Sequence, residues 1–300
     1  MIFIAITGVI CFWITFFTTK ERIVPSVAEK NTIKQDLTDL VKNKPWVIML
    51  SLTVLVFITL ALKGGMYIYY FKYYLDPTAQ ANYLESIGFN TFITGLSDTI
   101  TGFGLGKFEW PEDAPTSANS LFNAGGIIFM IFGILFSKSL ADKFGKRNIF
   151  GIFLTLSAVC LLMFYFYPKD SIGLVFLTQI LHGFMYGVTI PLLWAMIADV
   201  ADYSEWKNNR RATAIIFSAM IFGLKAGLSI GGSLGAALLS KYGYVAEQAE
   251  QTAEAIEGIK MSVSIYPGLI FLAGAVLLFW YEINKAMEVR IESELALKRK

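Results

Sequence analysis

The sequence is short of charge, cysteine and histidine, and each shortage excludes a class of protein. Only 16% of its 300 residues are charged and 55% are apolar, whereas soluble domains usually carry about a quarter charged residues. The chain has two cysteines, Cys11 and Cys160, and one histidine, His182. That is too few for a disulfide framework or a zinc cluster of the usual spacing, so we expect no metal site and no cofactor. The composition predicts an all-α polytopic membrane protein.

The distribution of the polar residues argues against a nucleic-acid-binding protein and against an enzyme. The net charge is +2 and no basic patch with interleaved aromatic residues occurs, so we expect no nucleic-acid partner. No nucleophile and base are paired within the apolar runs, and His182 has no acidic companion on its own run. We therefore expect no enzyme activity and no catalytic residue.

Seven apolar runs are long enough to approach or complete a membrane span. They cover residues 1–17, 46–75, 117–136, 149–167, 172–198, 212–239 and 262–281. The first is interpreted as a span rather than a cleaved signal, because it has no basic segment before it and no small-residue cleavage site after it. The polar segments between the runs are interpreted as a cytoplasmic linker at 18–45, an extracellular loop at 76–116 with a surface-lying or re-entrant helix, and a cytoplasmic tail at 282–300.

The distribution of basic residues predicts the orientation of the spans. Of the 25 lysines and arginines, 18 fall in the four segments 18–45, 138–148, 199–211 and 282–300. Short cytoplasmic loops are enriched in Lys and Arg, so these segments are predicted to face the cytoplasm. The amino terminus is then outside and the carboxyl terminus inside.

Two charged turns and one charged span resemble a known family. The turn from Asp142 to Arg147, DKFGKR, resembles the basic cytoplasmic loop of the major facilitator superfamily, although a solvated basic turn would look similar. The stretch from Asp199 to Lys207, DVADYSEWK, followed by Lys225-Ala-Gly in mid-span, is similar to the glycoside-pentoside-hexuronide:cation symporters of that superfamily.

The resemblance implies a fold of about seven transmembrane helices. Residues 1–17 would match helix 6, the last of a missing amino-terminal half, and residues 46–281 would match the carboxyl-terminal six-helix bundle, with 18–45 as the linker between bundles. The missing half would be a partner and would hold the coupling-cation site, so Met1 is interpreted as an internal methionine of a longer protein. The coupling ion is expected to be Na⁺ or H⁺.

Four residues are candidates for contact with a sugar. Lys225 matches the family's lysine in the eleventh helix, and Trp194 falls near a sugar-facing aromatic residue of the tenth, although a structural ion pair and ordinary packing are alternatives. Lys63 is a second lysine in an apolar run, where an unpaired charge is costly. Tyr67 and the tyrosines that follow could stack a sugar beside it, with Gly64-Gly65 permitting a helix break; an aromatic belt at the membrane interface is the alternative.

The charged turns are expected to form a cytoplasmic gate. Its candidate residues are Asp142, Lys143, Gly145, Arg147, Asp199, Asp202, Glu205, Lys207 and Arg211. His182 is interpreted as a buried, hydrogen-bonded side chain, with a proton relay as the alternative. Ala219, Gly223, Gly227, Gly231 and Gly235 recur every four residues, a pattern typical of close helix packing.

The function predicted from this resemblance is cation-coupled symport of a sugar or glycoside by alternating access. The protein would be multi-pass in the cytoplasmic membrane, in contact with lipid, and would form one wall of the sugar cavity. The alternative from another class is a seven-span sensor or receptor without solute flux.

Overall fold

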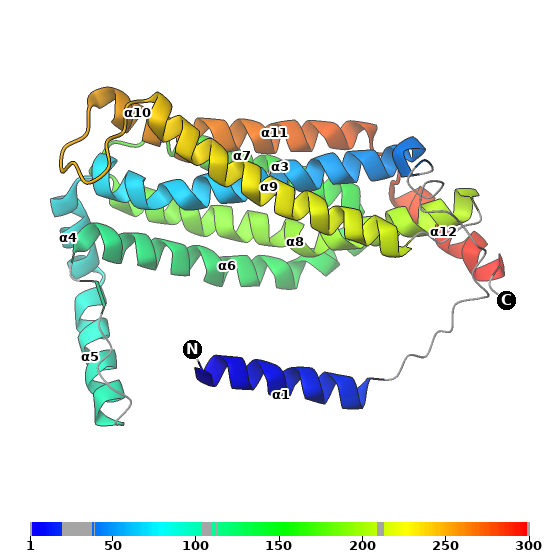
Figure 1. The fold of residues 1–300 in the computed structure, drawn as a ribbon, viewed down its shortest axis with the longest axis horizontal. Coiled ribbons are helices and arrows are strands. Elements are labelled where there is room, and N and C mark those ends of the chain that lie inside the picture. Colours follow the sequence, from blue (N-terminus) through cyan, green and yellow to red (C-terminus); the bar gives the residue numbers. More distant parts are fainter. Residues whose placement is uncertain are drawn as a thin grey trace. The chain divides into compact units, whose positions relative to one another are not determined.

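The described part of the protein consists of helices joined by turns and loops. The computed structural model describes residues 2–19, 38, 40–103, 110–111, 113–208 and 213–298, and no β-strand occurs among them. Its helices are α1 (Ile2–Thr18), α3 (Lys44–Tyr69), the π-helical η1 (Tyr70–Tyr74), α4 (Pro77–Ser86), α5 (Phe89–Gly102), α6 (Ala114–Phe144), α7 (Lys146–Met163), α8 (Ile172–Asn208), α9 (Thr213–Lys241), α10 (Ala253–Val263), α11 (Ile265–Leu277), the 3₁₀-helical η2 (Leu278–Trp280) and α12 (Lys285–Lys298) (Figure 1). The all-α prediction is confirmed.

Six helical segments of the described chain are long and apolar enough to cross a membrane. They are Lys44–Tyr74, Ala114–Phe144, Lys146–Met163, Ile172–Asn208, Thr213–Lys241 and Ala253–Trp280. These are the six later spans predicted from the sequence. The first predicted span is helix α1, whose 17 residues make it shorter than those six. Residues 1–39 form a unit of their own, and residues 40–300 form the second.

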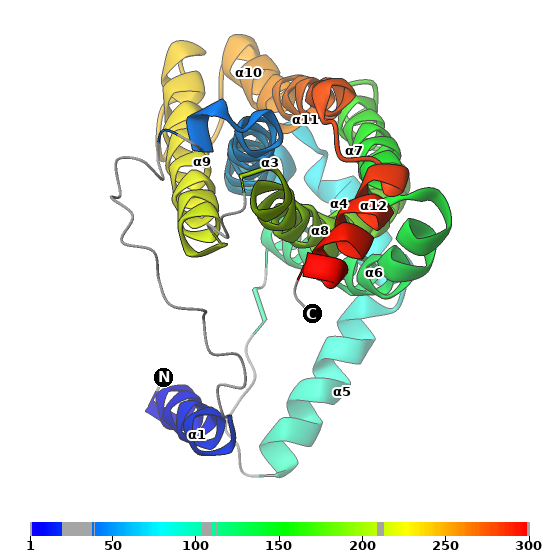
Figure 2. The same cartoon turned by 90° about the vertical axis from the view of Figure 1, so that its right-hand side faces the viewer.

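The second unit is a bundle in which the spans pack in the order α9, α3, α11, α7, α8 and α6. Figure 2 views this bundle along its axis and shows α3 and α8 with neighbours on either side. Its core is built from large apolar side chains such as Phe71, Phe122, Phe164 and Phe271. Many apolar side chains on the outside, including Phe222 and Phe279, remain exposed. A hydrophobic exterior of this kind suits contact with lipid.

Glycines bring neighbouring spans into close contact. A Cβ atom added at Gly227 would lie 2.7 Å from the carbonyl oxygen of Val54 on α3, and Gly223 would meet Leu50 on the same helix at 2.7 Å. Gly231 and Gly235 also face α3, so the predicted packing role of this stripe is confirmed. Gly183 and Gly187 of α8 approach the backbone of α6 in the same way.

The two predicted charged turns are shorter than predicted, because the helices continue into them. α6 extends to Phe144 and α7 begins at Lys146, which leaves Gly145 with φ of 85° as the only non-helical residue. Only glycine adopts that backbone conformation without strain. α8 likewise continues to Asn208, well past the predicted end of the span at residue 198. Lys, Glu and Arg are good helix formers, so a helix need not stop where its apolar run stops.

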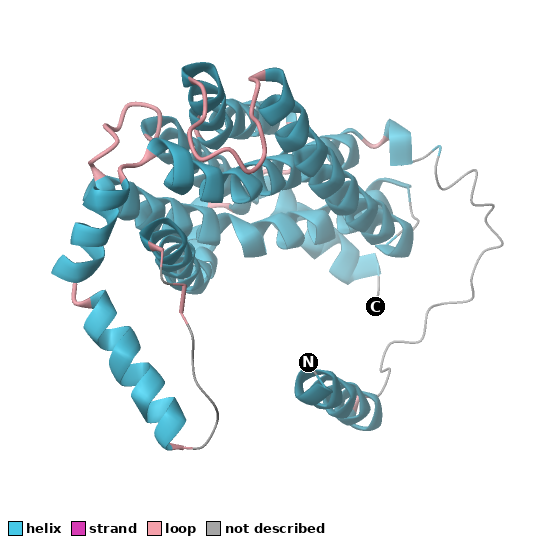
Figure 3. Ribbon diagram, turned by 60° about the vertical axis from the view of Figure 1, so that its left-hand side comes forward, coloured by secondary structure: helices cyan, strands magenta, loops and turns pink. Residues whose placement is uncertain are grey.

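The region between the first two bundle spans is also more ordered than a loop. α4 begins at Pro77, where the Asp76 carboxylate accepts a hydrogen bond from the backbone N–H of Ala79 at 2.8 Å. The buried amide of Gln80 donates to the carbonyl oxygens of Phe71 and Leu75 and so ties α4 to η1. α5 then leads away from the bundle (Figure 3). The predicted helix break at Gly64-Gly65 does not occur, since α3 continues through both residues.

Candidate functional site

The two lysines within the spans lie in opposite environments. Lys63, on α3, is 7% exposed and its Nζ lies 2.6 Å from Nε2 of His182 on α8. The other ring nitrogen of His182 lies 3.2 Å from the carbonyl oxygen of Ser157 on α7, so it is the donor in that contact. Nε2 then accepts a hydrogen bond from Lys63. Nε2 can accept this hydrogen bond only while it carries no proton. In this geometry the imidazole is therefore neutral, and the pair carries at most one positive charge.

Aromatic rings surround the Lys63 ammonium. Its Nζ lies 5.6 Å from the ring centroid of Tyr67 and 5.9 Å from that of Tyr186, both within the range of a cation–π interaction. His182 and Tyr186 are nearly parallel at 6.2 Å, and Phe271 of α11 continues the stack. Within the described chain no carboxylate forms an ion pair with Lys63. Ring faces and one imidazole therefore stabilise this cation.

Three buried polar atoms on the helices around this pair have no hydrogen-bond partner among the described residues. They are the hydroxyls of Tyr67 and Ser157 and Oε1 of Gln179. The ring of Tyr67 packs edge-on against Phe122 at 4.8 Å, inside the bundle. The structure thus brings Lys63 and Tyr67 together as predicted, but places both in the interior of the bundle. His182 is buried and hydrogen-bonded, as predicted.

Lys225 lies on the outer face of α9. The four-residue stripe that contains Gly223 and Gly227 faces α3, and Lys225 projects from the other side of the helix, where it is exposed among apolar residues such as Phe222 and Leu228. No hydrogen bond or ion pair joins it to another described residue. Trp194, on α8, is half-buried and packs against the core. Among the described contacts, none links Lys225 or Trp194 to Lys63 or Tyr67.

A cluster of charges ties together three helices at the end of the bundle near α12. The ammonium of Lys146, the first residue of α7, lies 2.7 Å from Asp199 of α8 and 2.8 Å from Glu288 of α12. The Asp199 and Glu288 side chains are only 14% and 20% exposed. One partly buried ammonium therefore bridges two carboxylates, which favours a fixed arrangement of α7, α8 and α12.

Further contacts dock α12 against the bundle. The indole N–H of Trp206 on α8 donates to Glu294 at 2.5 Å, and Nε of Arg290 donates to the same carboxylate at 2.8 Å. These two donors, Arg290 first, hold the pKa of Glu294 below its ordinary value. Lys285 donates to the carbonyl oxygens of Asp142 and Lys143, at the end of α6. Residues 285–298 of the predicted tail thus form a helix that is fastened to the bundle.

The predicted gate residues lie in different surroundings. Asp199, Arg147 and Lys207 make contacts within the bundle: Arg147 donates to the carbonyl oxygen of Phe279 at 3.3 Å, and Lys207 donates to the hydroxyl of Tyr203 at 3.1 Å. The side chains of Asp142 and Lys143 are exposed, beside the Gly145 turn. The remaining candidates are Asp202 and Glu205, which are half-buried on α8, and Arg211, which lies outside the described residues.

Sequence reasoning missed two members of the charged cluster. Lys146 lies in the basic turn but is not among the predicted gate residues, and Glu288 falls in the predicted cytoplasmic tail. No local pattern reveals their pairing, because Lys146 and Asp199 are 53 residues apart in the sequence. The only signal was the acidic and basic content of 282–300, which contains four glutamates.

Comparison with known proteins gives a consistent set of relatives. The model of a family described as MFS/sugar transport protein matches residues 1–97 and 114–285. The inner membrane symporter YicJ of Escherichia coli is 28% identical over 277 residues, covering 91% of this chain and 52% of its own. The isoprimeverose transporter of Lactiplantibacillus pentosus is 27% identical over 296 residues, covering 98% of this chain and 53% of its own. The glucuronide carrier protein homolog of Escherichia coli is 25% identical over 293 residues, covering 97% and 56%. The chain therefore spans little more than half the length of these relatives.

Proposed function

Because the chain belongs to the MFS/sugar transport protein family, we propose that it is the carboxyl-terminal half of a sugar or glycoside symporter that works by alternating access. The family match, which covers nearly the whole chain, is the observation on which this proposal chiefly depends. The six membrane-spanning helices support it, and so do relatives whose names include a symporter and carriers of isoprimeverose and glucuronide. A sensor without solute flux is not favoured by these relatives.

In this proposal the outer face of α9 belongs to the wall of the sugar cavity. Lys225 is exposed there at a depth where a free charge is costly, so a partner beyond the described residues has to compensate it. An amino-terminal bundle facing α9 would supply a carboxylate, and the sugar hydroxyls would supply further acceptors. Trp194 can stack on the apolar face of a sugar from the neighbouring helix α8. Lys63 and Tyr67 would act from inside the bundle, by fixing the positions of α3 and α8.

The cytoplasmic gate is proposed to use the charges that the bundle leaves exposed. Asp142 and Lys143 can reach a second bundle, whereas Asp199 and Arg147 hold the carboxyl-terminal bundle together through Lys146 and Phe279. Ion pairs across the two halves would form in the outward-facing state and separate when the cytoplasmic side opens. Asp142→Asn should therefore slow uptake while sugar binding stays measurable.

Transport tests the proposal when this chain is reconstituted in liposomes together with the amino-terminal half that the proposal requires. The vesicles are given a Na⁺ gradient, a proton gradient or no gradient, and uptake of a radiolabelled pentoside, glucuronide and galactoside is measured. We expect one of these sugars to accumulate at least tenfold more with one gradient than without. Absence of uptake for all three, from protein that remains folded and monodisperse, would overturn the proposal.

A further inference from the structure

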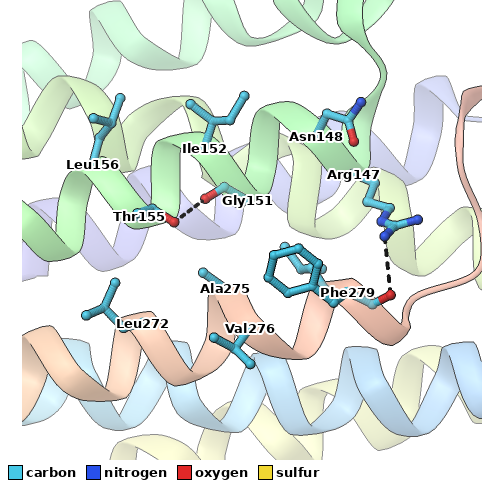
Figure 4. A pocket seen from close by; sticks show the side chains of 11 residues that line it. Arg147, Asn148, Gly151, Ile152, Thr155, Leu156, Leu272, Ala275, Val276 and Phe279 are labelled. Atoms are coloured by element: carbon cyan, nitrogen blue, oxygen red, sulfur yellow. Dashed lines mark hydrogen bonds between the residues drawn. The ribbon is translucent and has the colours of Figure 1, made fainter.

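A groove lies between α7 and the end of α11, on the outside of the bundle. Its volume is about 650 Å³, within the range of about 300–1,000 Å³ that is common for ligand sites. Ile152 and Leu156 of α7 line one side, and Val276 and Phe279 of α11 and η2 line the other. Arg147 and Asn148 stand at one end of the groove (Figure 4). The groove is thus apolar along its length and polar at one end.

The walls of the groove suit a hydrocarbon chain and are poorly suited to a sugar. Ile152, Leu156 and Val276 are each 40% exposed or more, on a face of two membrane-spanning helices. The hydroxyl of Thr155 donates to the carbonyl oxygen of Gly151 at 2.8 Å, so it offers no hydrogen to a ligand. A sugar would leave its hydroxyls without partners along these walls, which is unfavourable for each hydroxyl that stays unsatisfied.

The polar end of the groove favours an anion. Arg147 uses one N–H for the carbonyl oxygen of Phe279, and within the described chain it has no carboxylate partner. The nearby carboxylates of Asp199 and Glu288 are both bound by Lys146, and neither forms an ion pair with Arg147 among the described contacts. Arg147 and Asn148 also stand in the first turn of α7, where the helix dipole and free backbone N–H groups attract negative charge. The guanidinium group of an arginine can donate two parallel hydrogen bonds to the oxygens of one phosphate.

We propose that this groove binds one anionic glycerophospholipid from the membrane leaflet at the α12 end of the bundle. The phosphate lies against Arg147 and the amide of Asn148, and one acyl chain follows the groove between Ile152 and Val276. The same arginine fastens α7 to η2, just before the chain turns into α12. The lipid therefore strengthens the junction on which the charged cluster around Lys146 depends.

Native mass spectrometry of the detergent-solubilised protein tests this site. The protein is titrated with phosphatidylglycerol or with phosphatidylcholine of the same acyl chains, and the fraction that retains one lipid is measured. We expect at least fivefold greater retention of phosphatidylglycerol in the unaltered protein. Arg147→Gln should remove this preference, and Ile152→Trp, which fills the groove, should lower retention of both lipids. Inorganic phosphate at millimolar concentration should not compete.

A matched control separates the groove from general surface charge. Lys138, on α6, is exposed and does not line the groove, so Lys138→Gln should keep the full preference. Arg147→Lys, which keeps the charge, should retain part of it even if Arg147→Gln folds poorly. Equal losses in Arg147→Gln and Lys138→Gln would overturn the proposal, as would a preference unchanged by Arg147→Gln. A dimer mass that excludes lipid would assign the groove to a second copy instead. Because no step measures uptake, the result is independent of the proposed transport function.

Discussion

Lys63 and Lys225 both interrupt apolar runs, yet the fold gives them opposite surroundings. Lys63 is enclosed by α3 and α8, hydrogen-bonded to His182 and flanked by aromatic rings. Lys225 stands exposed on α9 and contacts no described polar group. A lysine in a membrane span is therefore informative only once its face of the helix is known. Lys63 has its partners within this bundle, whereas Lys225 needs a partner from outside the described residues.

A third lysine, Lys146, completes the comparison. It lies at the end of the bundle and contacts two carboxylates, so its charge is fully compensated within the protein. The three lysines thus form a series. Lys146 has ionic partners, Lys63 has a neutral hydrogen-bond partner, and Lys225 has no partner within the described chain. If this series is correct, removal of each partner should affect the stability of the bundle in a different way.

The largest loss of stability is expected for His182→Leu. This change leaves the Lys63 ammonium buried without a hydrogen-bond acceptor, and an unsatisfied buried charged donor costs about 3 kcal/mol. The double variant Lys63→Met/His182→Leu removes both polar groups and should recover most of that loss. Thermal unfolding of the two variants in detergent measures the difference. A double variant less stable than the single one would show that the pair is not the interaction that matters.

A smaller loss, about 2 kcal/mol, is expected when the glycine face of α9 is crowded. A valine at Gly227 would place its Cβ 2.7 Å from the Val54 carbonyl oxygen and 2.8 Å from Cβ of Phe57, so α9 would have to move away from α3. Gly232 is the matched control, since no atom lies within 4 Å of a Cβ there. The unfolding temperature should fall for Gly227→Val and change little for Gly232→Val. Equal shifts would indicate a loss of helix propensity rather than of packing.

Lys146→Met should cost less again, about 1 kcal/mol, because the released carboxylates of Asp199 and Glu288 can still reach water at the end of the bundle. The loss should fall mainly on the docking of α12. Hydrogen exchange of Lys285–Lys298, measured by mass spectrometry, should become faster while exchange in α3 stays unchanged. Uniformly faster exchange would mean that the cluster stabilises the whole bundle.

The spans themselves could be read from hydropathy, but their ends could not. α6 and α8 extend beyond their apolar runs because charged residues can continue a helix in water. Hydropathy gives no signal for such an extension. The four-residue recurrence of Gly223 and Gly227 did predict which face of α9 packs. It also held an unused signal: Lys225 is two residues, or about 200° of helix rotation, from both glycines and therefore belongs on the opposite face.

Lys63, His182 and Asp199 could be singled out from the sequence, whereas Lys146, Glu288 and the pairing of these residues could not. Lys63 and His182 are 119 residues apart, and nothing local distinguishes a lysine that meets an imidazole from one that meets a carboxylate. The same holds for Lys146 and Glu288, which only the folded positions of α7 and α12 bring together. Residue chemistry alone therefore identified the costly charges, while the compensation of each charge depended on long-range packing.

The smallest change in stability is expected for Lys225→Gln, although its effect on uptake should be the most severe. The side chain has no described partner, so the free energy of unfolding should change by no more than about 0.5 kcal/mol. If Lys225 meets its partner only across the sugar cavity, uptake into liposomes that also contain the amino-terminal half should fall at least tenfold, and Lys225→Arg should retain part of it because the charge remains. Normal uptake by a stable Lys225→Gln protein would place this lysine at the lipid surface, where its long side chain reaches the headgroups. Lys225 would then resemble Lys63 in sequence alone, and the sugar would have to be sought on another face of the bundle.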